Sequence, residues 1–121
     1  MNKKKITLIT GTSRGIGKFL VNYYLGKDHI VIGCSRKSSQ IENVNYFHFE
    51  LDVSDEIKVK KLFSFIRKEF GGLDVLINNA GVASMNHSVL TPITTARKIL
   101  DTNVIGTFLF SREAFKIMKT N

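Results

Sequence analysis

The feature that most constrains the fold of this chain is a glycine-rich turn between an apolar segment and a helical pattern. The turn, Thr-Gly-Thr-Ser-Arg-Gly-Ile-Gly, occupies residues 10–17 and follows the apolar run 6–9. Backbone amides at a helix start lack internal partners and carry partial positive charge, so a turn placed there suits a phosphate group. We expect Gly11 to allow the tight turn, Gly15 the close approach of a pyrophosphate, and Gly17 close packing of the helix on the strand.

Two kinds of pattern alternate along the chain. Short apolar or alternating runs predict four strands, at Ile6 to Thr10, Ile30 to Cys34, Tyr46 to Leu51 and Val75 to Asn78. Apolar residues spaced three and four apart predict helices between and after these strands. Because strands that alternate with helices form a parallel sheet with right-handed crossovers, we predict an α/β fold. It is a Rossmann-like, doubly wound sheet, with residues 1–121 as one domain.

Three helical patterns carry apolar stripes. The first predicts a buried face formed by Ile16, Phe19, Leu20, Tyr23 and Tyr24. The second has the stripe Val59, Leu62, Phe63, Ile66 and Phe70, with Ser54 as its expected N-cap and Gly71-Gly72 as its end. The third runs from Ala96 to Met118 with Asn103 on its apolar side. We expect loops at 37–44 and at 86–95, the second with at most a short helix.

Composition excludes several classes of protein. The 121 residues are 43% hydrophobic and 23% charged, which is typical of a soluble globular domain. No apolar run approaches the roughly 20 residues of a membrane-spanning helix, and the run 6–9 is too short for an export signal. One cysteine, Cys34, agrees with a reducing compartment. We therefore expect cytoplasmic residence and no membrane partner.

The net charge of +8 has three interpretations: a solvated surface, a nucleic-acid interface, or attraction to a phosphorylated small molecule. A nucleic-acid interface needs basic residues on one element together with stacking aromatic residues. Here the lysines are scattered in short groups and the phenylalanines fall at core spacings, so we expect no nucleic-acid partner. Attraction of a phosphorylated small molecule is a simpler explanation of the positive charge than a nucleic-acid interface. The three histidines, His29, His48 and His87, lack metal-ligand spacing, so we expect no metal site.

Two basic residues, Arg36 and Lys37, follow the second predicted strand. An acidic residue at this place would hold the ribose 2′-hydroxyl of NAD(H) and repel the 2′-phosphate of NADP(H). A guanidinium instead pairs with phosphate in bidentate fashion, and Arg14 in the glycine-rich turn can approach from the other side. We therefore predict NADP(H) rather than NAD(H) as the ligand. The alternative is that Arg36 and Lys37 only begin a solvated loop.

Four motifs in register resemble those of the short-chain dehydrogenase/reductase family. The spacing of Gly11, Gly15 and Gly17 is similar to the family's TGxxxGxG turn. Asp52-Val53 resembles the pair that meets the adenine, and Asn78-Asn79-Ala80-Gly81 resembles the NNAG signature beside the adenosine ribose. Asn103 resembles the helix asparagine of the family's Asn-Ser-Tyr-Lys tetrad. These motifs cover nearly the whole chain.

The resemblance implies a sheet order of 3-2-1-4 and an enzyme that transfers hydride between a nicotinamide cofactor and a carbonyl or alcohol carbon. The expected cofactor-binding residues are Gly11, Ser13, Arg14, Gly15, Ile16, Gly17, Arg36, Asp52, Val53, Asn79, Ala80 and Gly81. Asn103 is the expected catalytic position. Structural alternatives stay open: Asp52 can begin a helix, Asn78 can bond neighbouring strands, and Asn103 can be a buried asparagine with satisfied hydrogen bonds.

The family's serine and Tyr-x-x-x-Lys pair have no counterpart after the third helical pattern. Ser84 lies too early, and Tyr23 with Lys27 belongs to the first helix. We therefore expect this chain, as the N-terminal cofactor-binding portion of such an enzyme, to bind NADP(H) without acting on the small carbonyl or alcohol substrate. The alternative is a non-catalytic NADP(H)-binding or regulatory module. An unpaired edge at the fourth strand and exposed apolar surface on the third helix predict a homo-oligomer.

Overall fold

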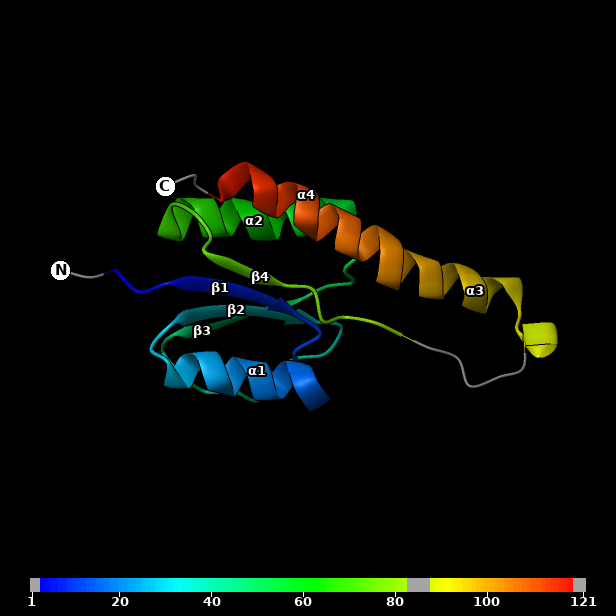
Figure 1. The fold of residues 1–121 in the computed structure, drawn as a ribbon, viewed down its shortest axis with the longest axis horizontal. Coiled ribbons are helices and arrows are strands. Elements are labelled where there is room, and N and C mark those ends of the chain that lie inside the picture. Colours follow the sequence, from blue (N-terminus) through cyan, green and yellow to red (C-terminus); the bar gives the residue numbers. More distant parts are fainter. Residues whose placement is uncertain (1–2, 83–87, 119–121) are drawn as a thin grey trace.

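A parallel four-stranded sheet lies between two helical layers in the computed structural model, which describes residues 3–82 and 88–118 (Figure 1). The strands are β1 (Ile6–Thr10), β2 (Ile30–Ser35), β3 (Tyr46–Glu50) and β4 (Val75–Ile77). Their order in the sheet, β3-β2-β1-β4, confirms the predicted doubly wound arrangement. The segment 37–44 contains no helix or strand, as predicted.

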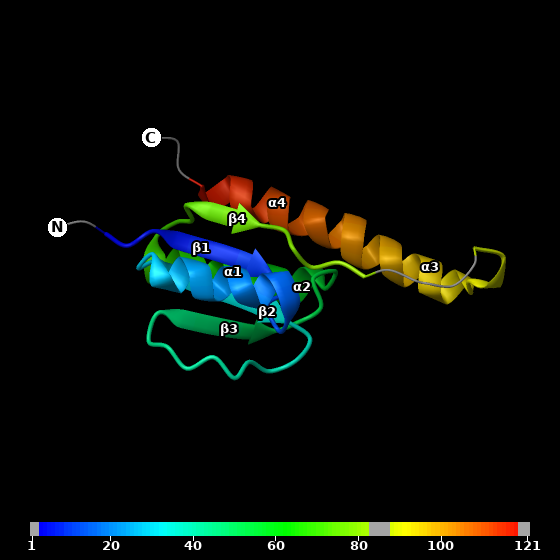
Figure 2. The same ribbon diagram turned by 60° about the horizontal axis from the view of Figure 1, so that its bottom comes forward.

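The two faces of the sheet carry different helices. Helix α1 (Gly15–Gly26) covers one face, whereas α2 (Glu56–Phe70) and α4 (Thr107–Ile117) lie side by side on the other (Figures 1 and 2). Because side chains alternate along a strand, neighbouring residues of β1 enter different cores. Leu8 packs among residues of α2 and α4, and Ile9 packs with Val21 of α1. β1 is therefore buried on both faces, which suits its apolar run, whereas β4 has a similar apolar run but is only half-buried.

The buried face of α1 is displaced by one residue from the predicted stripe. The residues that α1 buries or half-buries are Gly17, Leu20, Val21, Tyr24 and Leu25. The predicted stripe was wrong for Ile16, Phe19 and Tyr23, which are 70%, 66% and 48% exposed. The physical reason is Gly17, where an added Cβ would overlap the carbonyl oxygen of Gly11. Because glycine carries no hydrophobic side chain, the pattern of apolar residues gave no sign of the contact at Gly17 and indicated the neighbouring face of α1.

The stripe of α2 is as predicted, but its cap is not. Val59, Leu62, Phe63 and Ile66 are buried, and Gly71 ends the helix in the left-handed conformation at a φ of 80°. The N-cap is Asp55 rather than Ser54, because the Asp55 carboxylate accepts from the Lys58 amide at 3.2 Å. Ser54 instead donates its hydroxyl to the Asp52 carboxylate at 2.7 Å.

The third predicted helix is divided into three parts. Helix α3 (Ile93–Leu100) leads into a π-helical turn, η2 (Asp101–Gly106), and then into α4; a short 3₁₀ turn, η1 (Ser88–Leu90), precedes them. α3 thus begins at Ile93, three residues earlier than predicted and inside the predicted loop 86–95. The apolar side predicted for this helix was again displaced, because Asn103 is exposed. The residues buried along η2 and α4 are Thr102, Gly106, Leu109, Phe110, Glu113, Ala114 and Ile117. Gly106 lies where this helical segment packs against Val53, since a Cβ at Gly106 would lie 2.5 Å from Cγ2 of Val53.

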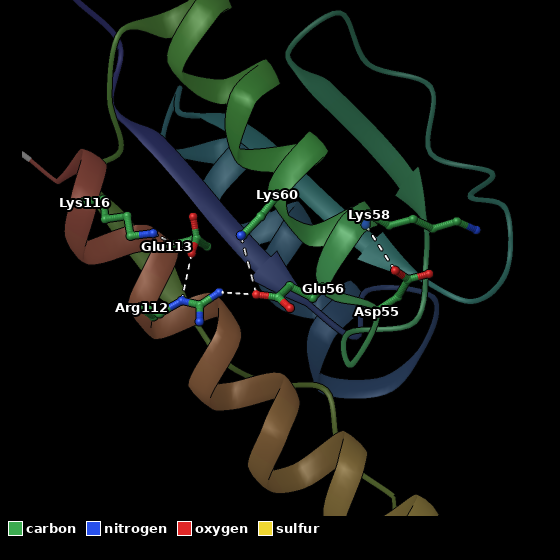
Figure 3. A network of polar contacts seen from close by, with 7 residues as sticks. All are labelled: Asp55, Glu56, Lys58, Lys60, Arg112, Glu113 and Lys116. Carbon is green, nitrogen blue, oxygen red and sulfur yellow. Dashed lines mark hydrogen bonds and ion pairs between the residues drawn. The ribbon is translucent and has the colours of Figure 1, made fainter.

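A polar network joins α4 to the start of α2 (Figure 3). The Arg112 guanidinium bonds Glu56 at 2.8 Å and Glu113 at 2.9 Å, and Lys116 bonds Glu113 at 3.0 Å. Burial raises the pKa of Glu113, but the hydrogen bonds from Lys116 and Arg112 outweigh it and lower the pKa below its ordinary value. The network thus keeps Glu113 ionised among apolar side chains.

We predict that Gly17→Ala lowers the free energy of unfolding by about 1–3 kcal/mol, the usual cost of forcing atoms into a packed contact. The backbone of Gly11 opposes the new methyl group and cannot rotate away as a side chain would. Gly26→Ala at the other end of α1 is the matched control, since nothing lies within 4 Å of a Cβ there. Urea-induced unfolding measures both variants, and an equal midpoint for the two would contradict the account.

Candidate functional site

The candidate site lies at the carboxyl edge of the sheet, where the glycine-rich turn meets the segments after β2 and β4. β1 pairs with β2 on one side and with β4 on the other. The connections that leave the carboxyl ends of these strands therefore run in opposite directions from β1. Such a switch point is where ligands bind in open α/β sheets. A pocket of about 910 Å³ opens at this edge.

Ten of the twelve predicted cofactor-binding residues line this pocket. They are Gly11, Ser13, Arg14, Gly15, Ile16, Arg36, Val53, Asn79, Ala80 and Gly81. The other two lie beside it: Gly17 is buried beneath the turn, and Asp52 faces a neighbouring hollow of about 480 Å³. The structure brings the predicted residues together, and their role toward a cofactor stays a prediction.

Hydrogen bonds tie the glycine-rich turn to the segment after β4. Gly11 and Gly15 have φ angles of 71° and 59°, which side chains disfavour. The Thr10 hydroxyl oxygen accepts from the amides of Asn79 and Ala80 at 2.9 and 2.8 Å. The Asn79 side chain in turn donates to the Gly11 carbonyl at 3.1 Å. The turn therefore has a defined shape before any ligand arrives.

The start of α1 has the properties of an anion site. Arg14 precedes the helix with an extended backbone and no side-chain capping bond, and the first turn holds no acidic residue. The first amides of α1 are therefore left for a ligand. Among the described residues that line the pocket none is acidic, and four are cationic: Arg14, Lys18, Arg36 and Lys37.

Arg36 lies between the pocket and the neighbouring hollow. Its guanidinium is 3.4 Å from Oδ2 of Asp52 and 3.5 Å from the Thr102 hydroxyl. The other Asp52 oxygen accepts from the amide and hydroxyl of Ser54. Burial raises the pKa of Asp52, but these two hydrogen bonds, Arg36 and Lys98 together lower it below the ordinary value of an aspartate. Asp52 thus has the structural role of a turn residue before α2, while its predicted contact with adenine stays untested.

Asn103 lies in the π-helical turn and does not line the pocket. Its side-chain oxygen accepts from the Val82 amide at 2.9 Å, and its side-chain nitrogen donates to the Val82 carbonyl at 2.8 Å. Its hydrogen bonds are satisfied, as one interpretation predicted, but the residue is exposed rather than buried. Asn103 therefore holds the backbone of Val82, directly after the NNAG motif, by two hydrogen bonds. Its catalytic role stays a prediction. Asn78 also makes a structural bond, to the Ser111 hydroxyl at 3.2 Å.

Other predicted or excluded residues lie away from the pocket or outside the described part of the chain. Tyr23 stands eight residues beyond Gly15, about 12 Å along the axis of α1, and its ring contacts the Lys27 ammonium at 5.5 Å. Ser84 and His87 lie outside the described residues. Within 3–82 and 88–118, no group of three His, Cys, Asp or Glu is placed to hold a metal ion. Over the same residues, no helix is long and apolar enough to cross a membrane.

Several contributors were not singled out from the sequence. Lys18 lines the pocket from the first turn of α1, and its place directly after the glycine-rich turn was a signal that the sequence offered. Val82 also lines it, directly after the NNAG motif. Thr102 reaches the pocket through the π-helical turn, for which the sequence carried no signal. Cys34 borders the pocket, but burial raises the pKa of its thiol to about 12 and makes it unreactive.

Comparison with known proteins gives consistent matches. A family profile described as short chain dehydrogenase matches residues 5–121. Farnesol dehydrogenase of Aedes aegypti is 32% identical, over 95% of this chain and 51% of its own. A short chain dehydrogenase from Leptospira borgpetersenii with bound NAD⁺ has a TM-score of 0.88 and 26% identity, covering 94% of this chain and 46% of that one. ElxO with NADP bound has a TM-score of 0.85 and 35% identity, covering 94% and 50%. The chain spans about half the length of these proteins.

We predict that Asp52→Asn destabilises the protein near neutral pH and that the difference from wild type narrows as the pH falls below about 4. The folded state holds the pKa of Asp52 below its ordinary value, so the ionised carboxylate stabilises the fold at neutral pH. This stabilisation is lost as the pH falls through the folded pKa. Thermal unfolding across this range tests it, with Glu42→Gln as an exposed control. A difference that stays constant with pH would show that Asp52 acts only through its shape.

Proposed function

The chain belongs to the short-chain dehydrogenase/reductase family, and we propose that its pocket binds NADP(H) for hydride transfer between nicotinamide and a carbonyl or alcohol carbon. The charge of the pocket lining carries this proposal. Four cationic side chains and no acidic one stand among the described residues that line it. Such a field attracts a ligand with an additional phosphate. The solved relatives bind NAD⁺ in one case and NADP in another, so the preference rests on this chain's own residues.

The residues present suit each part of the nucleotide. The turn from Gly11 to Gly17 offers free amides to the pyrophosphate, and an added side chain at either glycine would meet neighbouring backbone. Arg36 would pair with the 2′-phosphate, because its five donors allow it to keep Asp52 at the same time. Val53 and Asp52 would border the adenine, and Asn79 to Gly81 the ribose. The nicotinamide supplies the hydride chemistry.

We further propose that these 121 residues bind the cofactor without catalysing the reaction by themselves. Tyr23 and Lys27 form the one Tyr-x-x-x-Lys of the sequence, and they lie at the far end of α1 from the pocket. The same arrangement also suits a non-catalytic module that senses NADP(H). Cytoplasmic residence, which the buried thiol of Cys34 suits, is part of the proposal.

A homo-oligomer is also proposed, because α3, η2 and α4 leave apolar side chains in solvent. The exposed residues on these elements include Leu100, Val104, Ile105, Phe108 and Phe115. Within the described chain, β4 pairs only with β1 and leaves its other edge open. Sedimentation at several concentrations measures the assembly, and a compact monomer at all of them would contradict this proposal.

We predict that NADPH binds at least about tenfold more tightly than NADH, and that Arg36→Ala weakens NADPH binding by about 10- to 100-fold, the usual value of hydrogen bonds to a charged group. NADH binding should change little, because NADH has no 2′-phosphate. Isothermal titration calorimetry measures the four affinities, and Arg67→Ala on the exposed side of α2 is the charge-matched control. Equal affinity of the wild type for both nucleotides would contradict the NADP(H) preference.

We also predict that the purified 121-residue protein does not oxidise NADPH in the presence of small aldehydes and ketones. The absorbance of the reduced nicotinamide follows the reaction directly. A steady rate would contradict the proposal. Such a rate in Tyr23→Phe as well would show that another group of this chain serves as the acid.

A further inference from the structure

A series of hydrogen bonds runs beside the pocket, from the glycine-rich turn to the segment that carries Arg36 and Lys37. The Thr12 hydroxyl lies 3.1 Å from the Tyr46 hydroxyl, which lies 2.8 Å from Nδ1 of His48. Nε2 of His48 lies 2.8 Å from the Lys37 carbonyl oxygen. Thr12 and Tyr46 are 1% and 8% exposed, so water has little access to the first part of this series.

The strand pattern and one glycine make this connection geometrically available. Tyr46 and His48 are two residues apart on β3, so both project to the face of the sheet that α1 covers. On the adjacent strand β2, Gly33 pairs with His48 and has no side chain to block the path. A Cβ at Gly33 would overlap the Tyr46 hydroxyl and lie 2.8 Å from the Thr12 hydroxyl. Side chains of β3 can therefore cross β2 and reach the turn that follows β1.

The donors and acceptors of this series are consistent along its whole length. A carbonyl oxygen only accepts, so Nε2 of His48 carries a hydrogen toward Lys37. In the neutral imidazole, Nδ1 then accepts from the Tyr46 hydroxyl. The Tyr46 oxygen can accept from the Thr12 hydroxyl, which shares its hydrogen with the Cys34 carbonyl at 3.3 Å. Burial raises the pKa of Tyr46 and keeps its phenol protonated. Ser35 donates its hydroxyl to the same Lys37 carbonyl at 2.7 Å, so two donors hold that carbonyl.

We propose that Tyr46 and His48 are positioning residues that fix the backbone of Lys37, and with it Arg36, for a nucleotide that carries a 2′-phosphate. Neither side chain is among the residues that line the pocket, so both would act through the segment 36–41. The other side of the turn is held separately, by Thr10 and Asn79. Loss of the series should therefore affect discrimination at the 2′ position more than binding of the rest of the nucleotide. The inference rests on the proposed NADP(H) function.

The test compares NADPH and NADH affinities of the full chain by calorimetry. We expect Tyr46→Phe and His48→Leu to weaken NADPH binding about three- to tenfold, as for the loss of one hydrogen bond, with NADH binding unchanged. His48→Gln should recover most of the loss, because its amide can still donate to the Lys37 carbonyl. Hydrogen exchange without nucleotide provides a second readout: the amides of 36–41 should exchange faster in His48→Leu than in wild type.

His29→Leu is the matched control, because His29 likewise bonds a side-chain hydroxyl, that of Thr7 at 2.7 Å, but at the opposite edge of the sheet. If the wild type prefers NADPH while the His48 variants keep its affinity ratio and its exchange, the positioning role is overturned and the proposed function stands. If the wild type binds neither nucleotide, or both equally, the two proposals fall together. If Tyr46→Phe fails to fold, the His48 variants still test the positioning role, because His48 is only half-buried and its replacement disturbs the core less.

Discussion

The site depends on a close contact between two glycines, Gly17 and Gly11, neither of which has a side chain. Gly17 of α1 lies directly on the Gly11 carbonyl, with the Asn79 side-chain amide beside it. A Cβ at Gly17 would lie 2.7 Å from that amide nitrogen and overlap the carbonyl. Asn79 also donates to the same Gly11 carbonyl at 3.1 Å. The Gly11 carbonyl is therefore the point at which three segments meet: the start of α1, the glycine-rich turn and the segment after β4.

The electrostatics of the site follow from where this contact puts the start of α1. Free amides and Arg14 face the pocket from the helix, and Arg36 and Lys37 face it from the end of β2. The nearby carboxylate, Asp52, lies in the adjacent hollow and is already engaged by Ser54 and Arg36. Discrimination between two nucleotides that differ by one phosphate then depends on how firmly the segment 36–37 is held. The series from Thr12 to His48 gives that segment a mechanical connection to the turn.

The sheet was predictable from the sequence, whereas the faces of two helices were not. Strand positions and order follow from buried runs and from the motifs that end them, and ten pocket residues followed from the same motifs. The displaced faces of α1 and α4 share one cause, since Gly17 and Gly106 make the closest contacts and carry no hydrophobic signal. The connection from Tyr46 and His48 to the turn was also out of reach, because it depends on the register of β3 against Gly33. A single sequence does not show which residues of two strands stand opposite each other.

A crystal structure of the protein with NADP⁺ would show whether Arg36 holds the 2′-phosphate. We expect the pyrophosphate at the amides that open α1 and the 2′-phosphate within hydrogen-bond distance of the Arg36 guanidinium. We also expect the bond from His48 to the Lys37 carbonyl to remain in the complex. A nucleotide bound away from the glycine-rich turn, or a 2′-phosphate that faces solvent without contact to Arg36, would contradict the proposal.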